Sequence, residues 1–297
     1  MSVPVSGSLA EPETALTAAD REFFAENGYV VIPDAVPAEL LPAVIKVIWD
    51  FLDMDPERPQ DWYRPPLTPG GMVELYQHQA MWDVRQHPRL HRIFTEILGT
   101  ERLWVTNDRV SMRPPRHPAH PEFDHPGFIH WDWDTAVLPV PFGVQGVLAL
   151  ADTSEDQGGF CCVPGMHRTL EDWIRTQPPN RDTRRPDLTG LTVKNVATRA
   201  GDLIVWRRDL AHGNGRNLSD RPRLAQYVTM FEPPPEADAY ERQRADRITA
   251  WKERRNPIAT YFPGDPRRVE WERYETATLT DLGRRLLGLD PWPPSSR

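Results

Sequence analysis

Apolar residues recur at helical intervals in the first third of the chain. In segments 37–51 and 88–99 they follow one another three or four positions apart, as on one face of a helix. A helix is also predicted to begin at Thr17, because Thr17 and Asp20 have the spacing of a capping box. Residues 29–32 form a short apolar run that indicates a strand.

After residue 99 the apolar positions alternate with polar ones or form short runs, which is the pattern of strands. Gly, Pro, Asn and Asp separate these runs. A polar helix is predicted at the end, at 236–254. Helices followed by many short strands predict a mainly β fold, an antiparallel sandwich or jelly roll with a helical shell. The expected strands are 103–112, 128–132, 144–150, 160–163, 191–196, 203–206 and 224–231.

No internal repeat or linker divides the chain. Residues 1–15, rich in Ser, Pro, Ala and Glu, are predicted to be a disordered leader. Segment 16–232 is predicted to be one domain, with the N-terminal helices packed on the jelly roll. Segment 233–297 is predicted to be a C-terminal extension packed on that domain.

Composition excludes several classes of function. The 297 residues carry a formal net charge of −8, whereas a nucleic-acid or anionic-membrane binder needs the opposite sign. No apolar run is long enough to cross a membrane, and the first residues lack the basic and apolar regions of a secretory signal. We therefore expect a cytoplasmic protein that acts on a small molecule. The sequence leaves its oligomeric state open.

A histidine and a carboxylate are spaced for metal binding at His130-Trp131-Asp132. Side chains two positions apart on a strand point the same way, so His130 and Asp132 would face a common point. Such a pair supplies two ligands of a facial triad of two histidines and one carboxylate, which binds Fe(II). A rival pair, His120 and Glu122, lies in a proline-rich stretch that is predicted to be a loop, so we rank it lower.

The third ligand must come from elsewhere in the chain. His212 follows the apolar strand 203–206, and Arg223 opens the next strand, with Tyr227 on its face. A guanidinium that points into a barrel needs an anionic partner, and a dicarboxylate would supply one. Arg216 and Arg221 remain competing candidates for this role.

These residues carry a resemblance to a known family. The pair His130-x-Asp132, the glycine-rich stretch 158–167, and His212 followed by Arg223 resemble the phytanoyl-CoA dioxygenase family, as does the opening at 16–35. The resemblance spans about residues 16–232. It implies a double-stranded β-helix of the cupin-like jelly-roll type, with Fe(II) as the metal and with 2-oxoglutarate and O2 as cosubstrates.

The resemblance also implies roles for single residues. His130, Asp132 and His212 would be the catalytic iron ligands, and Arg223 would bind the distal carboxylate of 2-oxoglutarate. Asn214 stands where the family often has a serine, and its side chain is expected to reach the cosubstrate.

Further polar and aromatic residues are predicted to line the cavity. On strand 103–112, Asn107, Arg109 and Ser111 alternate on one face. We expect Asn107, together with Gln145, to contact the cosubstrate. The substrate pocket is expected to include four residues: Arg109, Trp133, Trp206 and Tyr227.

The sequence thus predicts an iron- and 2-oxoglutarate-dependent oxygenase. It would hydroxylate, or otherwise oxidise, an unactivated C–H bond of a small organic molecule and release succinate and CO2. Two alternatives remain, a non-catalytic jelly-roll module that binds a metal or metabolite, and a metal-dependent hydrolase or isomerase of cupin type. The second has no need for Arg223.

Overall fold

Two antiparallel sheets form the centre of the computed structural model, which describes residues 14–257 and 263–293. A third, two-stranded sheet joins β12 (Met230–Phe231) and β3 (Trp104–Val105). The larger sheet has the order β1 (Tyr29–Ile32), β9 (Leu203–Arg207), β6 (Val144–Ala149), β11 (Arg223–Tyr227), β4 (Val110–Arg113) and β2 (Met72–Val73). The smaller sheet has the order β5 (Phe128–His130), β10 (His212–Asn214), β7 (Phe160–Cys162) and β8 (Lys194–Asn195).

The larger sheet is apolar on both faces, and each face has its own core. On β9, Leu203 and Val205 belong to the core cluster shared with the helices, whereas Ile204 and Trp206 belong to the cluster shared with the smaller sheet. Alternation along a strand produces this division. Two antiparallel sheets that face each other across a core, with helices outside, confirm the predicted fold class of a jelly roll with a helical shell.

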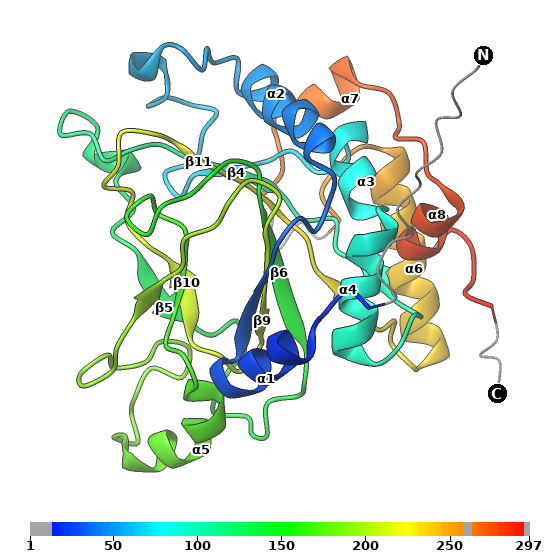
Figure 1. Ribbon diagram of the computed structural model, residues 1–297. Coiled ribbons are helices and arrows are strands. Elements are labelled where there is room, and N and C mark those ends of the chain that lie inside the picture. Colours follow the sequence, from blue (N-terminus) through cyan, green and yellow to red (C-terminus); the bar gives the residue numbers. More distant parts are fainter. Residues whose placement is uncertain (1–13, 258–262, 294–297) are drawn as a thin grey trace, which may run out of the picture.

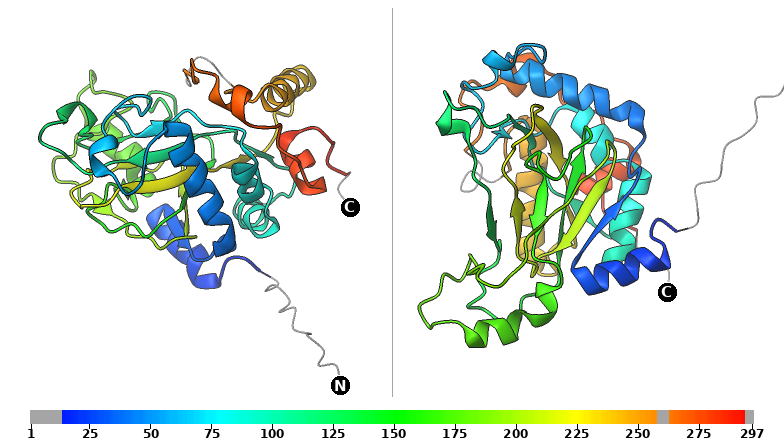
Figure 2. Two further views of the ribbon diagram at one scale, coloured as in Figure 1. Left: turned by 90° about the horizontal axis from the view of Figure 1, so that it is seen from above. Right: turned by 60° about the vertical axis from the view of Figure 1, so that its left-hand side comes forward.

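Helices cover the outer face of the larger sheet (Figure 1). In Figures 1 and 2, α3, α4, α6 and α8 lie together on this side, whereas α5 lies at the opposite end of the molecule. The α-helices are α1 (Ala18–Asn27), α2 (Leu41–Leu52), α3 (Gln79–Arg85), α4 (Pro88–Leu98), α5 (Met166–Thr176), α6 (Ala237–Lys252), α7 (Val269–Arg273) and α8 (Asp281–Leu287). Short 3-10 helices occur at Ala38–Leu40, Pro59–Asp61 and Pro121–Phe123. No helix in the described ranges is long and apolar enough to cross a membrane.

The local signals for helix ends agree with the structure. Thr17 and Asp20 form the predicted capping box of α1, and Gly28 ends that helix with a φ of 78°. Gly99 ends α4 in the same left-handed conformation. Glycine adopts this conformation without the strain that a Cβ atom brings.

The strand predicted at 103–112 is interrupted. It divides into β3 and β4, and residues 106–109 between them are not in a strand. The predicted strand 224–231 is likewise divided into β11 and β12. Thr106 and Thr229 join the two interruptions through a hydrogen bond from the Thr106 amide to the Thr229 carbonyl (2.8 Å). Six α-helices and strands were not predicted from the sequence: β2, α3, α5, β10, α7 and α8.

Residues 1–13 of the predicted leader lie outside the described residues, but its last residue does not behave as predicted. Ala15 is buried, and its amide donates to Glu96 Oε1 (2.6 Å). At the other end of the chain, Arg247 of α6 donates to the carbonyls of Leu287 and Val105, which joins this helix to α8 and β3. The domain boundary at residue 232 remains a prediction.

Candidate functional site

The three predicted metal ligands come together between the two sheets. His130 ends β5 and His212 begins β10, and the two residues are direct partners in the antiparallel pairing. Asp132 lies just beyond the end of β5. Its carboxylate oxygens are 3.3 Å from His130 Nε2 and 3.7 Å from His212 Nε2. Among the described residues, this is the only group of three or more His, Cys, Asp and Glu side chains with such proximity.

The environment of the two imidazoles fits a metal ion. His212 is buried, and its Nδ1 lies 2.9 Å from the carbonyl of Leu210, so this nitrogen carries the proton and Nε2 offers its lone pair. Nε2 of His130 faces the same carboxylate. Two neutral imidazoles and one carboxylate that leave one side open are the donor set of a mononuclear Fe(II) site.

Two partners hold the Asp132 side chain. Gln145 Nε2 donates to Asp132 Oδ2 (2.6 Å), and the indole of Trp206 donates to Gln145 Oε1 (3.1 Å). Burial opposes ionisation of Asp132, but the neighbouring imidazoles of His130 and His212 and the Gln145 amide outweigh it and hold the pKa of the carboxyl below its usual range. Asp132 is therefore ionised at neutral pH, as a metal ligand must be.

A cavity of about 340 Å³ opens beside the triad. This volume suits a small organic ligand. The predicted site residues that line it are His130, Asp132, His212, Arg109, Gln145, Trp206, Asn214 and Tyr227. Other residues that were not predicted also line the cavity, among them Met72, Asp108, Arg113, His125, Phe128 and Phe160.

Two buried arginines lie side by side at one end of this cavity, which we call the deep end. Arg223 of β11 and Arg113 of β4 are direct partners in the sheet, and each is at most 4% exposed. Arg223 Nη1 lies 3.4 Å from the Tyr227 hydroxyl, which in turn accepts from Asn214. Within the described ranges, neither arginine makes an ion pair with a carboxylate.

Neutral groups satisfy part of Arg113. Its Nη1 donates to the carbonyl of Gly215 (3.0 Å) and lies 3.1 Å from His125 Nδ1. Its Nε is buried without a hydrogen-bond partner in the described part of the chain. Burial lowers the pKa of Arg113 to about 10, so the side chain stays charged at neutral pH. The deep end therefore has two positive charges and no protein carboxylate to balance them.

The two other arginines that could bind the dicarboxylate are not available for this role, because one is paired with a carboxylate and the other is exposed to solvent. Arg216 Nε donates to Asp124 Oδ1 (2.7 Å), so its charge is already paired. Arg221 is exposed to solvent. Of the three candidates, Arg223 alone is buried and adjoins a residue of the cavity, Tyr227.

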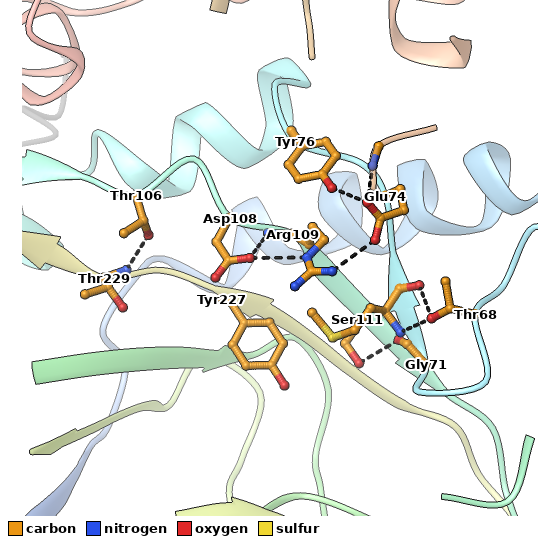
Figure 3. A network of polar contacts seen from close by, with 12 residues as sticks. Thr68, Gly71, Glu74, Tyr76, Thr106, Asp108, Arg109, Ser111, Tyr227 and Thr229 are labelled. Carbon is orange, nitrogen blue, oxygen red and sulfur yellow. Dashed lines mark hydrogen bonds and ion pairs between the residues drawn. The ribbon is translucent and has the colours of Figure 1, made fainter. Parts of the chain in front are cut away.

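At the other end of the cavity, the mouth, an arginine has two acidic neighbours (Figure 3). Arg109 Nη1 is 3.0 Å from Glu74 Oε1, and Arg109 Nε is 3.5 Å from Asp108 Oδ1. Glu74 also accepts hydrogen bonds from the Tyr76 hydroxyl and from the amide of Gly264. This cluster joins the mouth to the C-terminal extension.

Three predicted site residues do not line the cavity, and one of them is Arg223, which only adjoins it. Asn107 lines a different cavity, between segment 106–108 and α6, because the chain leaves the strand conformation at 106–109 and the expected alternation fails there. Trp133 turns away because a bend follows Trp131, and its indole donates to the carbonyl of Val137 (2.9 Å).

The rival pair, His120 and Glu122, also lies apart from the triad. His120 stacks on Tyr63 with ring centroids 4.9 Å apart, and Glu122 is the second residue of the 3-10 helix Pro121–Phe123.

Arg113 could have been predicted as a site residue from the sequence. It follows Arg109 and Ser111 at the same spacing of two residues, which places all three on one face of an extended strand.

The fold and the site together define a class. The jelly roll places two histidines and one carboxylate at the edge of a cavity. Arg113 lines that cavity, Arg223 lies beside it, and neither forms an ion pair within the described residues. This is the arrangement of a mononuclear non-haem iron oxygenase that takes an anionic cosubstrate.

Comparison with known proteins agrees with this class. The model of the phytanoyl-CoA dioxygenase (PhyH) family matches residues 24–225. A putative phytanoyl-CoA dioxygenase of Dictyostelium discoideum is 21% identical over 259 residues, which cover 71% of this chain and 74% of the relative. An ectoine dioxygenase of Halomonas elongata is 25% identical over 238 residues, with coverages of 72% and 69%.

A solved structure shares the fold. The epimerase SnoN, in complex with Fe3+, alpha ketoglutarate and nogalamycin RO, superposes with a TM-score of 0.50 at 18% identity, over 74% of this chain and 88% of SnoN. The chain belongs to the phytanoyl-CoA dioxygenase family, as the resemblance implied. It is a non-haem iron- and 2-oxoglutarate-dependent dioxygenase, with Fe(II) as metal and 2-oxoglutarate and O2 as cosubstrates.

Proposed function

We propose that this protein hydroxylates an unactivated C–H bond of a small organic molecule. One O2 and one 2-oxoglutarate are consumed, one oxygen atom enters the substrate as a hydroxyl group, and the other enters succinate as CO2 leaves. The observation that carries the proposal is that Arg113 lines the cavity of the triad and Arg223 lies beside it, neither of them in an ion pair with a carboxylate of the described residues. A buried cation without an anion is costly, and a dicarboxylate of matching length removes that cost.

The chain would hold the metal and the cosubstrate at two points, the triad and the deep end of the cavity. His130, Asp132 and His212 would hold Fe(II), and Arg223 would bind the distal carboxylate of 2-oxoglutarate, with Arg113 as a second cation beside it. Fe(II), when bound together with 2-oxoglutarate, activates O2 and supplies the oxidising power. The protein contributes binding, orientation and exclusion of water around this chemistry.

Two neighbouring side chains would set the orientation. Gln145 links the Asp132 carboxylate to the indole of Trp206, so the carboxylate has one preferred direction. The Tyr227 hydroxyl lies between Arg223 and Asn214, and the positive charge of the arginines outweighs burial and lowers the pKa of this tyrosine. Tyr227 is therefore suited to donate a hydrogen bond to a carboxylate at the deep end.

The alternatives explain less of the site. A hydrolase or isomerase of cupin type uses similar ligands but gives the two arginines no role. A binding module without turnover would need the arginines only if its ligand were an anion. The cytoplasmic location and the absence of nucleic-acid and membrane partners remain predictions.

The test is release of succinate from 2-oxoglutarate by the purified protein with Fe(II) and O2, in the absence and presence of candidate substrates. We expect slow release without substrate and none in His130→Ala or Asp132→Ala. Glu122→Gln, in the rival pair, is the matched control and should keep the activity. No succinate from the folded, iron-loaded protein would contradict the proposal, as would equal activity in the Asp132→Ala variant.

A further inference from the structure

The mouth of the cavity contains a carboxylate that the chain does not fully use. Asp108 lines the same cavity as His130, Asp132 and His212. It lies on the non-strand segment that leads into β4, and its side chain is 28% exposed, so a ligand in the cavity can reach it. Figure 3 shows it on one side of Arg109, with Glu74 on the other.

In the part of the chain that the structure describes, only one oxygen of Asp108 has hydrogen-bond partners. Oδ1 accepts from the Arg109 amide (2.7 Å) and lies 3.5 Å from Arg109 Nε. Within residues 14–257 and 263–293, Oδ2 accepts no hydrogen bond. A carboxylate offers about four acceptor positions on its two oxygens, so about half of this capacity is not used by donors of the described residues.

The nearby cations are engaged elsewhere. Arg109 is 3.0 Å from Glu74, closer than to Asp108. Arg85 approaches from the helical side, but its guanidinium donates to the backbone carbonyls of Tyr76 and Asp108 and not to the Asp108 carboxylate. Burial raises the pKa of Asp108, and the attraction of Arg109 and Arg85 opposes this without cancelling it. The negative charge of the Asp108 carboxylate is therefore only partly balanced by the neighbouring arginines.

We propose that Asp108 is a specificity-determining residue that binds a protonated amine, or another cationic nitrogen, of the substrate through Oδ2. This inference rests on the proposed function, because it places the substrate of that reaction at the mouth of the cavity. A charge-assisted hydrogen bond from a cation to this oxygen would supply the missing donor. Arg109 and Glu74 are then positioning residues that fix the direction of the Asp108 carboxylate.

The two ends of the cavity would then discriminate by charge. The arginines at the deep end attract the 2-oxoglutarate dianion, whereas Asp108 at the mouth attracts a cation. A substrate with a positive nitrogen would be turned so that this nitrogen lies at the mouth and its carbon skeleton extends toward His130 and Asp132. The class of substrate is therefore an amine-bearing small molecule.

The test is competitive binding measured by saturation-transfer NMR on the full-length protein loaded with Zn(II), in place of iron, and 2-oxoglutarate. The probes are linear and cyclic primary amines, the N-acetyl derivative of each amine, and carboxylic acids of the same size. We expect amines to bind at least about tenfold more tightly than their acetylated partners, because a hydrogen bond to a charged group contributes about 1.5–3 kcal/mol.

Two variants separate this interaction from general electrostatics. Asp108→Asn keeps the size of the side chain and should remove the preference for amines while 2-oxoglutarate binding stays unchanged. Asp172→Asn changes the net charge equally, at an exposed position on α5, and should keep the preference. The thermal midpoint and the affinity for 2-oxoglutarate report whether Asp108→Asn is folded.

Three results would overturn the inference. They are an absence of preference for amines in the wild-type protein, an equal loss in the two variants, and a preference for the carboxylic acids. The last would assign recognition to two exposed residues near the triad, Arg184, which donates to the Asp132 carbonyl, and Arg185, which lies over the Phe128 ring. Succinate release by the same protein, loaded with Fe(II) instead of Zn(II), tests the proposed function separately, so a failure of one is distinguishable from a failure of the other.

Discussion

The two ends of the cavity differ in whether their arginines form ion pairs with carboxylates of the protein. At the mouth, Arg109 lies between Glu74 and Asp108. At the deep end, Arg113 and Arg223 lie beside each other, with only carbonyls, an imidazole and a hydroxyl as hydrogen-bond partners in the described structure. Arg109 forms ion pairs within the protein, whereas Arg113 and Arg223 are free to bind an anionic ligand. An arginine that lacks a carboxylate partner in the protein therefore indicates where an anionic ligand binds, and the number of arginines alone does not.

The largest expected effect concerns the metal that lies between these two ends. Asp132→Ala removes the only carboxylate of the triad, and we expect the affinity for Fe(II) to fall by more than about 100-fold, beyond the loss typical of an outer partner of a metal ligand. Isothermal titration with Fe(II) under anaerobic conditions measures this. An Asp132→Ala protein that binds iron as tightly as the wild type would place the metal elsewhere.

The deep end should respond to loss of either arginine. Arg223→Met and Arg113→Met should each raise the KM for 2-oxoglutarate by about 10- to 100-fold, because each removes a charged partner of the distal carboxylate. Steady-state succinate release gives the KM. Arg216→Met is the matched control, since Arg216 already pairs with Asp124. If all three variants had the same KM, the deep end would not be the cosubstrate site.

Stability should change in opposite directions at the two ends. Without 2-oxoglutarate, Arg113→Met should increase the free energy of unfolding by about 1–3 kcal/mol, because an apolar residue replaces a buried, unpaired charge. Arg109→Met should decrease it by about 3 kcal/mol, because it leaves Glu74 and Asp108 without their cation. Urea unfolding of the metal-free proteins compares them. Changes of the same sign in both variants would contradict the distinction between the ends.

A smaller effect is expected at the link between the triad and the larger sheet. Gln145→Leu removes the hydrogen bond to Asp132 but no metal ligand. We expect kcat to fall by about tenfold, at the lower limit for an outer partner of a metal ligand, with little change in the KM for 2-oxoglutarate. Gln145→Asn, which keeps the amide, should recover part of the loss. A variant with unchanged kcat would show that Asp132 needs no such support.

The sequence predicted the residues that depend on local spacing. The capping box at Thr17 and the pair His130 and Asp132 depend on neighbours within three positions, and the structure contains the capping box. It also brings His130 and Asp132 together, although β5 ends at His130 and the predicted strand does not reach Asp132. His212 was found as a candidate, but its strand was not, because the glycines and asparagines that follow it are atypical of strands.

The rest of the site depends on contacts between distant segments. Asn107 was misplaced because Thr106 bonds to Thr229 and the chain leaves the strand geometry before β4 begins. Nothing near Arg109 in the sequence indicates that Glu74, 35 positions earlier, would pair with it. Tertiary pairing decides which charges are left for a ligand, and a single sequence does not contain that information.

The most direct test of the central claim compares 2-oxoglutarate with 2-oxopentanoate, which keeps the keto acid but lacks the distal carboxylate. Calorimetric titration of the Zn(II)-loaded wild-type protein should show at least about 100-fold tighter binding of 2-oxoglutarate, and the Arg113→Met/Arg223→Met protein should bind both with similar affinity. Equal affinities in the wild type, or a preference that survives the loss of both arginines, would contradict the account.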